Sequence, residues 1–252
     1  MIDFRRTTLA RHIAAVACIS LLATLQPVVA DASPATAPQA GVVAAQPMAK
    51  KKSTYSISRG PNETNRVILT FDDCPKSLKA FKKTVVAAEK ANVGLALFPT
   101  GDCIKSGLFD AKYARKHGHH VFNHSVSHPD LTKLSKSEVK KQLRSPGVET
   151  TYGRPPYGAY NNTVKSAYKA VGMKIWTWTV DTNDWRGKSK SEVVNYVVKN
   201  AKKKDTVLMH MQWNGFSGDA IKKMKKGLNK KGITVCRNYE GTAPAKPKTM
   251  WC

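Results

Sequence analysis

Short apolar runs alternate with segments of helical periodicity along most of this chain. The runs are rich in β-branched residues and bounded by polar turns, which is typical of buried strands in a parallel sheet. We expect strands at residues 67–71, 93–98, 120–123, 173–180, 206–211 and 233–236. Apolar residues recur at helical spacing between them, at residues 78–88, 109–116, 162–171 and 219–229. This order predicts an α/β fold with a parallel sheet, either a barrel or an open doubly wound sheet.

Two identical four-residue segments mark further helix starts. Ser135–Glu138 and Ser189–Glu192 both read Ser-Lys-Ser-Glu. In such a capping box the serine oxygen and the glutamate carboxylate satisfy free amides at the first turn of a helix. We therefore expect a helix to begin at each of these segments.

The first part of the chain is typical of an exported protein. Residues 1–30 combine a basic start, an apolar stretch and a small-residue cleavage site, so we interpret them as a signal peptide. The Sec route is the first expectation, and Arg5–Arg6 only weakly suggest the twin-arginine route. We expect a secreted or cell-wall-associated protein.

Three further regions follow the signal. Residues 31–60 are rich in Ala and Pro and are expected to be a disordered linker. Residues 61–240 are enough for one domain with its own core. Residues 241–252 form a C-terminal tail.

The charge of the chain is strongly positive. The formal net charge is +25, and it remains +23 without residues 1–30. Such a charge favours polyanionic partners, and an exported protein would meet anionic cell-wall polymers or membrane surfaces. Export argues against nucleic acid. The alternative is that the lysines, such as Lys222–Lys223 and Lys225–Lys226, only solvate helix faces. We expect a monomer.

Four cysteines remain after removal of the signal: Cys74, Cys103, Cys236 and Cys252. An even number in an exported chain indicates disulfides, and three pairings are possible. A Cys236–Cys252 bridge would hold the tail, and a Cys74–Cys103 bridge would tie two loops that follow adjacent strands. The alternative is that Cys74 stays a free thiol beside a metal.

A candidate metal site is the most informative feature. Asp72 and Asp73 end the first apolar run, and His124 and His128 follow about fifty residues later. One carboxylate and two imidazoles supply three ligands and leave a position open for water. We interpret Asp73, His124 and His128 as ligands, with the imidazoles on one face if the segment turns helically. Asp72 is then free to act as a base. The alternative is capping or surface roles for these side chains.

His210 closes an apolar run and is a candidate general acid, with a core histidine as the alternative. Either Asp184 or Asp181 could hold its imidazole. Arg154 could orient the Asp72 carboxylate through paired hydrogen bonds.

The tryptophans divide into two groups. Trp176 and Trp178 alternate on one expected strand and are interpreted as core residues. Trp185 and Trp213 follow candidate site residues, where their rings could stack on sugars. Three other histidines match no usable spacing and are interpreted as structural: His117, His119 and His120.

Taken together, these motifs resemble the polysaccharide deacetylase family, carbohydrate esterase family 4, whose members contain the NodB-homology domain. The resemblance covers residues 66–236. The five motifs, in the order of the family, are Thr70–Pro75, His124–His128, Arg154–Tyr157, Asp181–Trp185 and Leu208–His210.

This resemblance implies a distorted (β/α) barrel of about seven strands that hydrolyses an N- or O-acetyl group on a glycan. It implies zinc as the metal, with cobalt, nickel or manganese as alternatives. Asp72 would be the base and His210 the acid, with Asp184 as its partner and Arg154 positioning Asp72.

The resemblance also assigns the substrate side of the site. The backbone amide of Tyr157 would help the metal to hold an oxyanion, and Leu208 and Trp185 would border the acetyl group. Trp213 is a further candidate for substrate binding. One departure is Cys74, because the family usually has glycine after the Asp-Asp pair.

We therefore expect an exported, metal-dependent glycan deacetylase that acts on peptidoglycan or another N-acetylglucosamine polymer, chitin included. The alternatives are an esterase for acetylated xylan or small esters, and a basic cell-wall-binding protein without catalysis.

Overall fold

The computed structural model describes residues 55–144, 148–250 and 252. The expected signal and most of the expected linker lie outside these residues. The strands are β1 (Ile68–Asp73), β2 (Leu95–Pro99), β3 (His120–Val121), β4 (Tyr152–Gly153), β5 (Lys174–Ile175), β6 (Val180–Asp181) and β7 (Thr206–His210). The helices are α1 (Leu78–Lys90), α2 (Gly101–Lys105), α3 (Ala111–Lys116), α4 (Lys136–Gln142), α5 (Asn162–Ala170), α6 (Lys190–Asn200) and α7 (Gly218–Lys230). Three short 3₁₀ turns cover Leu131–Lys133, Pro156–Gly158 and Asp184–Arg186.

The strands form an open, distorted barrel. A five-stranded sheet has the order β3-β2-β1-β7-β6, and β4 pairs with β5 in a second sheet. Every pairing is parallel. A bridge between Asn123 and Gly153 joins the two sheets. The α/β fold expected from the strand–helix order is confirmed, but the barrel does not close, because β5 and β6 are not paired.

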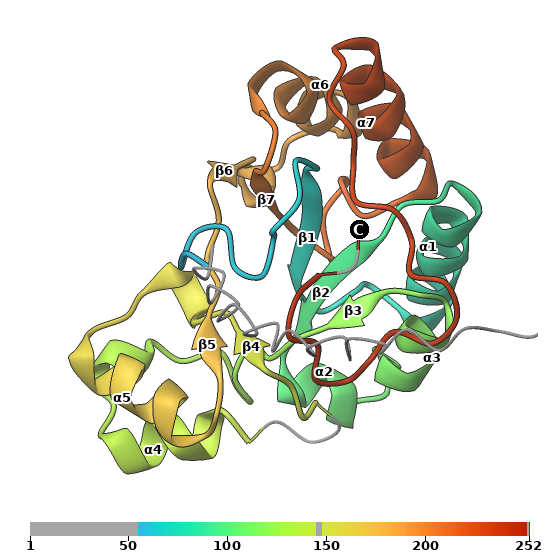
Figure 1. Ribbon diagram of the computed structural model, residues 1–252. Helices are drawn as coiled ribbons and strands as arrows, with labels where there is room; N and C mark the ends of the chain where they lie inside the picture. The colour runs from blue at the N-terminus through green and yellow to red at the C-terminus, as the bar shows by residue number, and fades with distance from the viewer. Residues whose placement is uncertain (1–54, 145–147, 251) are drawn as a thin grey trace, which may run out of the picture. The chain divides into compact units, whose positions relative to one another are not determined.

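Successive side chains of β1 point to opposite faces of the sheet and contribute to two separate apolar cores. Leu69 and Phe71 face the outer core, between the sheet and the helices α1, α3, α6 and α7. Ile68 belongs to the inner core with Phe98 and Trp176. Figure 1 shows α6 and α7 together on one side of the large sheet, while α4 and α5 lie beside the small sheet.

Both predicted capping boxes are present. Ser135 starts α4 and Ser189 starts α6, and each serine side chain accepts a hydrogen bond from the amide of the glutamate three residues later. The α4 and α5 pair buries a third, smaller core under the two-stranded sheet.

The expected strand 173–180 is divided into β5 and β6. Arg154 explains the break, because its Nε and Nη2 donate to the carbonyl oxygens of Trp176 and Thr177. These carbonyls turn inward instead of joining a ladder. Trp176 is fully buried as expected, but Trp178 is only half-buried.

One other expected strand is absent from the described residues, and two short elements were not expected. Residues 233–236 form no strand but a single parallel bridge between Val67 and Val235. Their backbone hydrogen bonds to the sheet reach only Val67 and Gly94, which precede β1 and β2. The two-residue strand β4 and the short helix α2 were not expected. Both are too short for a periodic pattern.

Two disulfides tie the fold. Cys74 pairs with Cys103, which links the loop after β1 to α2. Cys236 pairs with Cys252, which holds the tail where Met250 packs against the inner core. Residues 55–60, placed in the linker by the sequence, already contact the domain, because Thr177 donates a backbone hydrogen bond to Ile57. Among the described helices, none combines the length and the apolar character needed to cross a bilayer.

Candidate active site

The predicted motifs meet at the carboxyl ends of the strands. β1 and β7 are parallel neighbours, and their register places Asp72 opposite His210. The Met211 amide donates to the Asp72 carbonyl at 2.9 Å, which extends this pairing beyond β7. The candidate base and the candidate acid therefore come from adjacent positions of one sheet.

The His124–His128 segment is a loop and not the helical turn that its spacing suggested. Ser125 and His128 have positive φ values of 63° and 60°. The Asn123 side chain accepts from the Ser125 amide at 2.9 Å, and the Ser125 hydroxyl accepts from the His128 amide at 3.0 Å. This folding brings the two imidazole rings to 4.9 Å.

Asp73, His124 and His128 form a cluster that fits a metal ion. Asp73 Oδ1 lies 3.4 Å from Nε2 of each histidine. The three ligand atoms lie within 4.8 Å of one another. His124 Nδ1 bonds to the Arg154 carbonyl at 2.8 Å, which leaves Nε2 as the ring nitrogen that faces the cluster. One carboxylate and two imidazoles suit Zn²⁺, and the donor set leaves room for water.

Gln212 holds the second oxygen of the Asp73 carboxylate. Its Nε2 donates to Asp73 Oδ2 at 2.8 Å, while its Oε1 is buried without a partner among the described residues. The unshared oxygen Oδ1 is thereby turned toward the histidines. Sequence reasoning missed this residue, although it stands only two positions after His210.

The electrostatics of the cluster favour a cation. Burial raises the pKa of Asp73, but hydrogen bonds from His124 and Gln212 outweigh it and hold this pKa well below its usual range. Burial lowers the pKa of His124, but the Asp72 and Asp73 carboxylates outweigh it and raise the net pKa. At His128 burial prevails and lowers the pKa. The negative charges of Asp72 and Asp73 thus favour a cation within the Asp73–His124–His128 cluster.

Arg154 is fully buried and positions Asp72. Its Nη1 donates to Asp72 Oδ1 at 2.6 Å and to the Thr70 hydroxyl at 2.9 Å. The expected paired bonds to the carboxylate are absent among the described residues, since the other donors bind backbone carbonyls. Asp72 Oδ2 therefore has no bond to Arg154 and lies 3.6 Å from His124 Nε2.

Asp184 is the partner of His210. Its Oδ1 lies 2.7 Å from His210 Nδ1, and its Oδ2 accepts from the His210 amide at 2.9 Å. Asp181, the other candidate, accepts from the Asn183 amide instead. Burial lowers the pKa of His210, but its hydrogen bond to Asp184 and the charges of the nearby aspartates outweigh burial and raise the pKa.

Backbone conformations of high energy gather at these motifs. Among the described residues, seven other than glycine have positive φ, and five of them lie in the predicted motifs: Asp73, Ser125, His128, Tyr157 and Asn183. Such conformations persist only where the surrounding structure enforces them, and they are concentrated at functional sites. The bridged Cys74 follows one of them.

The substrate side carries exposed aromatic rings. Tyr157 is 69% exposed, and its ring centroid lies 4.8 Å from that of His128. Trp185 is 48% exposed, whereas Leu208 is buried. Trp213 is half-buried, and its amide donates to the His210 carbonyl at 3.2 Å.

Trp178 belongs to the surroundings of the site and not to the core, contrary to the sequence interpretation. Its ring lies 5.7 Å from the guanidinium carbon of Arg154. It also covers Gly158, where an added Cβ would meet the ring at 2.5 Å. Its alternation with Trp176 suggested the core, because the break in the strand is not visible in the sequence.

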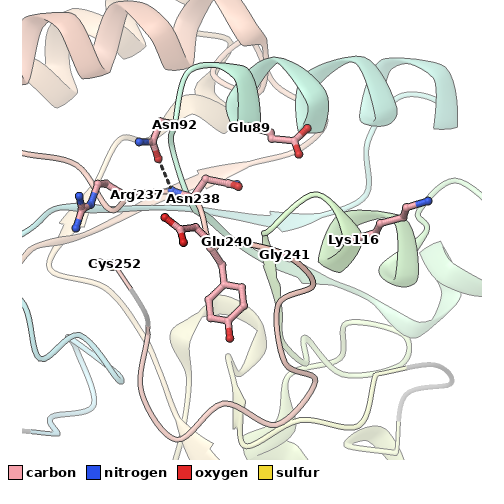
Figure 2. A pocket seen from close by; sticks show the side chains of 9 residues that line it. Glu89, Asn92, Lys116, Arg237, Asn238, Glu240, Gly241 and Cys252 are labelled. Carbon is pink, nitrogen blue, oxygen red and sulfur yellow. Dashed lines mark hydrogen bonds between the residues drawn. The ribbon is translucent and has the colours of Figure 1, made fainter. Parts of the chain in front are cut away.

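A separate hollow of about 860 Å³ lies beside the C-terminal segment (Figure 2). It is lined by residues of both charges, among them Glu89, Lys116 and Arg237. None of the metal-binding or catalytic candidates lines it, so it is distinct from the Asp–His cluster.

Comparison with known proteins identifies the family of these motifs. The family model described as polysaccharide deacetylase matches residues 59–176. A peptidoglycan-N-acetylglucosamine deacetylase of Bacillus cereus is 32% identical over 194 residues, which cover 72% of this chain and 70% of that protein. Other curated relatives are longer, and the chain spans 32% of the length of one of them.

Solved structures show the same fold. The peptidoglycan deacetylase PdaC of Bacillus subtilis is 30% identical with a TM-score of 0.60, and the match covers 69% of this chain and 88% of that one. A CE4 family pseudoenzyme of Bacillus anthracis is 25% identical with a TM-score of 0.61. The match covers 69% of this chain and 64% of that chain.

Proposed function

This chain belongs to the polysaccharide deacetylase family, and from that premise we propose that it removes acetyl groups from an N-acetylated glycan, with peptidoglycan as the first candidate. The observation that carries the proposal is the pairing of Asp72 with His210 at one register beside the Asp73–His124–His128 cluster, where Asp72 Oδ2 lies 3.6 Å from His124 Nε2. Relatives that act on peptidoglycan, together with the net charge of +25, support this substrate.

Asp73, His124 and His128 would hold a divalent metal ion, for which zinc is our proposal. Such an ion supplies Lewis-acid polarisation and makes water more acidic near neutral pH. Asp72 accepts the proton of the attacking water through Oδ2, because Arg154 already binds Oδ1 and fixes the orientation of the carboxylate.

His210 protonates the leaving nitrogen. Asp184 accepts a hydrogen bond from His210 Nδ1 and thereby leaves Nε2 to face the substrate. The Tyr157 backbone amide, held by the strained turn at φ 60°, contributes a hydrogen bond to the oxyanion of the transition state. Exposed Trp185 and Tyr157 provide the apolar contact with the sugar and its acetyl group.

The cellular setting is part of the proposal. The basic start and apolar stretch within residues 1–30 support export by a signal peptide. We place the protein in the cell wall or outside the cell, as a monomer whose basic surface contacts anionic wall polymers.

The test is acetate release from purified peptidoglycan, chitin oligomers and acetylated xylan. We expect release from an N-acetylated glycan that stops after chelation and returns with zinc. In Asp72→Asn we expect a loss of at least about 100-fold, because the base is removed. Its metal affinity should remain within a few-fold of wild type, since Asp72 is not among the three ligands.

The outcomes separate the alternatives. Release from acetylated xylan alone would make the chain an O-acetyl esterase. Bound zinc without acetate release from any of the three would reject the deacetylase and leave a wall-binding protein, as in a pseudoenzyme.

A further inference from the structure

Seven lysines line two adjoining grooves on the outer surface, away from the Asp–His cluster. One groove, of about 420 Å³, runs along α1, and the other, of about 560 Å³, runs along α7. Lys222 lines both grooves, and no aspartate or glutamate lines either. The two grooves therefore form one continuous basic surface, which we call the α1/α7 lysine surface.

Close packing of the two helices creates this surface. At Gly218, the first residue of α7, an added Cβ would lie 2.4 Å from the Cβ of Ala87 on α1. Lys225 then reaches across and donates to the Ala91 carbonyl at the end of α1. The contact between α1 and α7 brings their lysines to facing sides of the grooves.

Five of the seven lysines have no structural role within the described residues. Lys225 caps α1, and the Lys82 ammonium lies 4.8 Å from the Tyr113 ring centroid. The others are exposed and make no hydrogen bond or ion pair in the described part of the chain: Lys83, Lys90, Lys222, Lys226 and Lys230.

Three of these form a stripe on one face of α7. Lys222, Lys226 and Lys230 are spaced by four residues, so successive lysines are about 6 Å apart along the helix axis. Like charges at this spacing destabilise a helix. Elsewhere on the same helix the charge is compensated, since Lys223 lies 3.1 Å from Asp219. Only the face toward the grooves lacks a counter-charge, which an external anionic chain would supply.

The chemistry of the surface limits its occupant. The large hydrophobic side chains exposed in the described residues are Tyr157, Tyr160 and Trp185, and none is on α1 or α7. Nucleic-acid bases need aromatic rings on which to stack, and membrane anchoring needs exposed apolar side chains. Tyr113 is the one aromatic residue that lines either groove, but it is partly buried against the outer core beneath the Lys82 ammonium. Rows of ammonium groups without an exposed aromatic or large apolar side chain suit a chain of phosphates, which lysine binds as a point charge.

We propose that the α1/α7 lysine surface binds a linear phosphodiester polymer without bases, such as a polyol phosphate. The surface lies outside the Asp–His cluster, so this inference does not depend on the proposed deacetylation. Binding there would hold the protein beside its neutral glycan substrate in an anionic wall.

The experiment measures the affinity of the full chain for poly(glycerol phosphate) over a series of NaCl concentrations. The test variant combines Lys83→Gln, Lys222→Gln and Lys226→Gln. The matched control combines Lys136→Gln, Lys141→Gln and Lys169→Gln, three exposed lysines on α4 and α5. Both variants lose the same charge, so only the position differs.

We expect the test variant to bind about tenfold more weakly and the control variant to bind nearly as well as wild type. The slope of log affinity against log salt should flatten by about 2 in the test variant, since each phosphate contact contributes about 0.7. Acetate release from a soluble chitin oligomer should be equal in all three proteins. Polymer binding by a protein that releases acetate from none of the three substrates named above would reject the proposed function and leave this inference standing.

Three results would overturn the inference. The first is no binding of poly(glycerol phosphate) by the wild type. The second is an equal loss in both variants, which would mean that net charge alone attracts the polymer. The third is equally tight, surface-dependent binding of a single-stranded oligonucleotide or of vesicles of anionic phospholipid, which would assign the surface to that partner instead.

Discussion

Asp184 sets the protonation of His210 through two hydrogen bonds. The raised pKa of His210 means that the ring keeps its proton to a higher pH than an ordinary histidine, whose pKa is about 6.5. A general acid must begin the reaction protonated. On the alkaline side, activity therefore falls as the pH rises through the raised pKa of His210 and the imidazolium loses its proton. The alkaline limb of the pH profile therefore lies above about 6.5.

In Asp184→Asn we expect the alkaline limb of kcat/KM to move to lower pH, because the negative charge that stabilises the imidazolium is gone. We also expect kcat to fall at least about tenfold. The pH profile of acetate release measures both effects. Asp181→Asn is the control, since that carboxylate accepts only from the Asn183 amide. An unmoved limb in Asp184→Asn would exclude His210 as the acid.

Gln212 decides which oxygen of Asp73 faces the histidines. Removing a group that orients a metal ligand typically weakens metal affinity by about 10- to 100-fold. We expect this loss in Gln212→Met, which keeps the volume but not the amide. Competition with a chelator, together with the visible absorption of the Co²⁺-loaded protein, measures it. Asn214→Ala, which loses only a bond to the Lys188 carbonyl, should bind metal as wild type does. Wild-type affinity in Gln212→Met would show that Asp73 needs no such support.

At the scale of elements, the C-terminal segment is held by a disulfide near the start of β1, while the site lies at its end. The Cys236 amide donates to the Val67 carbonyl, and Cys236 and Cys252 close a loop with a sequence separation of 16 residues. A loop of this length is worth about 3 kcal/mol in the chain-entropy model.

We therefore expect Cys236→Ser with Cys252→Ser to lower the free energy of unfolding by about 3 kcal/mol, measured by chemical denaturation. Metal affinity should be unchanged, because the bridge contacts none of the three ligands. A fall in metal affinity of the folded variant would show that the two ends of the barrel are coupled.

At the scale of the whole molecule, two buried histidines make the fold sensitive to acid. Burial lowers the pKa of both His119 and His120 to about 4. His119 is satisfied by the Val85 carbonyl and the Leu95 amide, whereas neither ring nitrogen of His120 has a partner among the described residues. Their sequence interpretation as structural residues agrees with this burial.

Because the folded pKa values lie below the unfolded value of about 6.5, the unfolded chain binds more protons in this window. The free energy of unfolding should keep its full value above about pH 6.5. It should fall by a few kcal/mol as the pH drops from about 6.5 to about 4. His120→Phe should remove about half of this fall, as measured by denaturation at pH 7.5 and pH 5. An unchanged fall in this variant would assign the acid sensitivity to other groups.

The chemistry-bearing residues of the site were visible in the sequence because each motif is local. Asp72, Asp73, His124 and His210 stand at or just after the ends of apolar runs, and parallel strands bring such positions to one edge of a sheet. His128 stands four residues after His124. The helices other than α2 were equally visible, since periodicity and the two capping boxes act within a few residues.

Contacts between distant segments were decided only by the tertiary structure. The sequence left Asp181 and Asp184 as alternatives, and the choice depends on which carboxylate meets β7. It also predicted one strand at 173–180, whereas Arg154 draws the carbonyls of Trp176 and Thr177 out of the ladder. Gln212 and Trp178 reach the site across the fold, so no local pattern marks them.

The sequence by itself determined the alternation of strands and helices, the cysteine number and the candidate groups for metal binding and proton transfer, because these depend on residue type and short-range spacing. The tertiary structure decided the open barrel, the strained loop that brings His124 to His128, and the oxygen of Asp73 that faces them. Those features depend on backbone conformations of high energy, which only the packing of the whole domain can maintain.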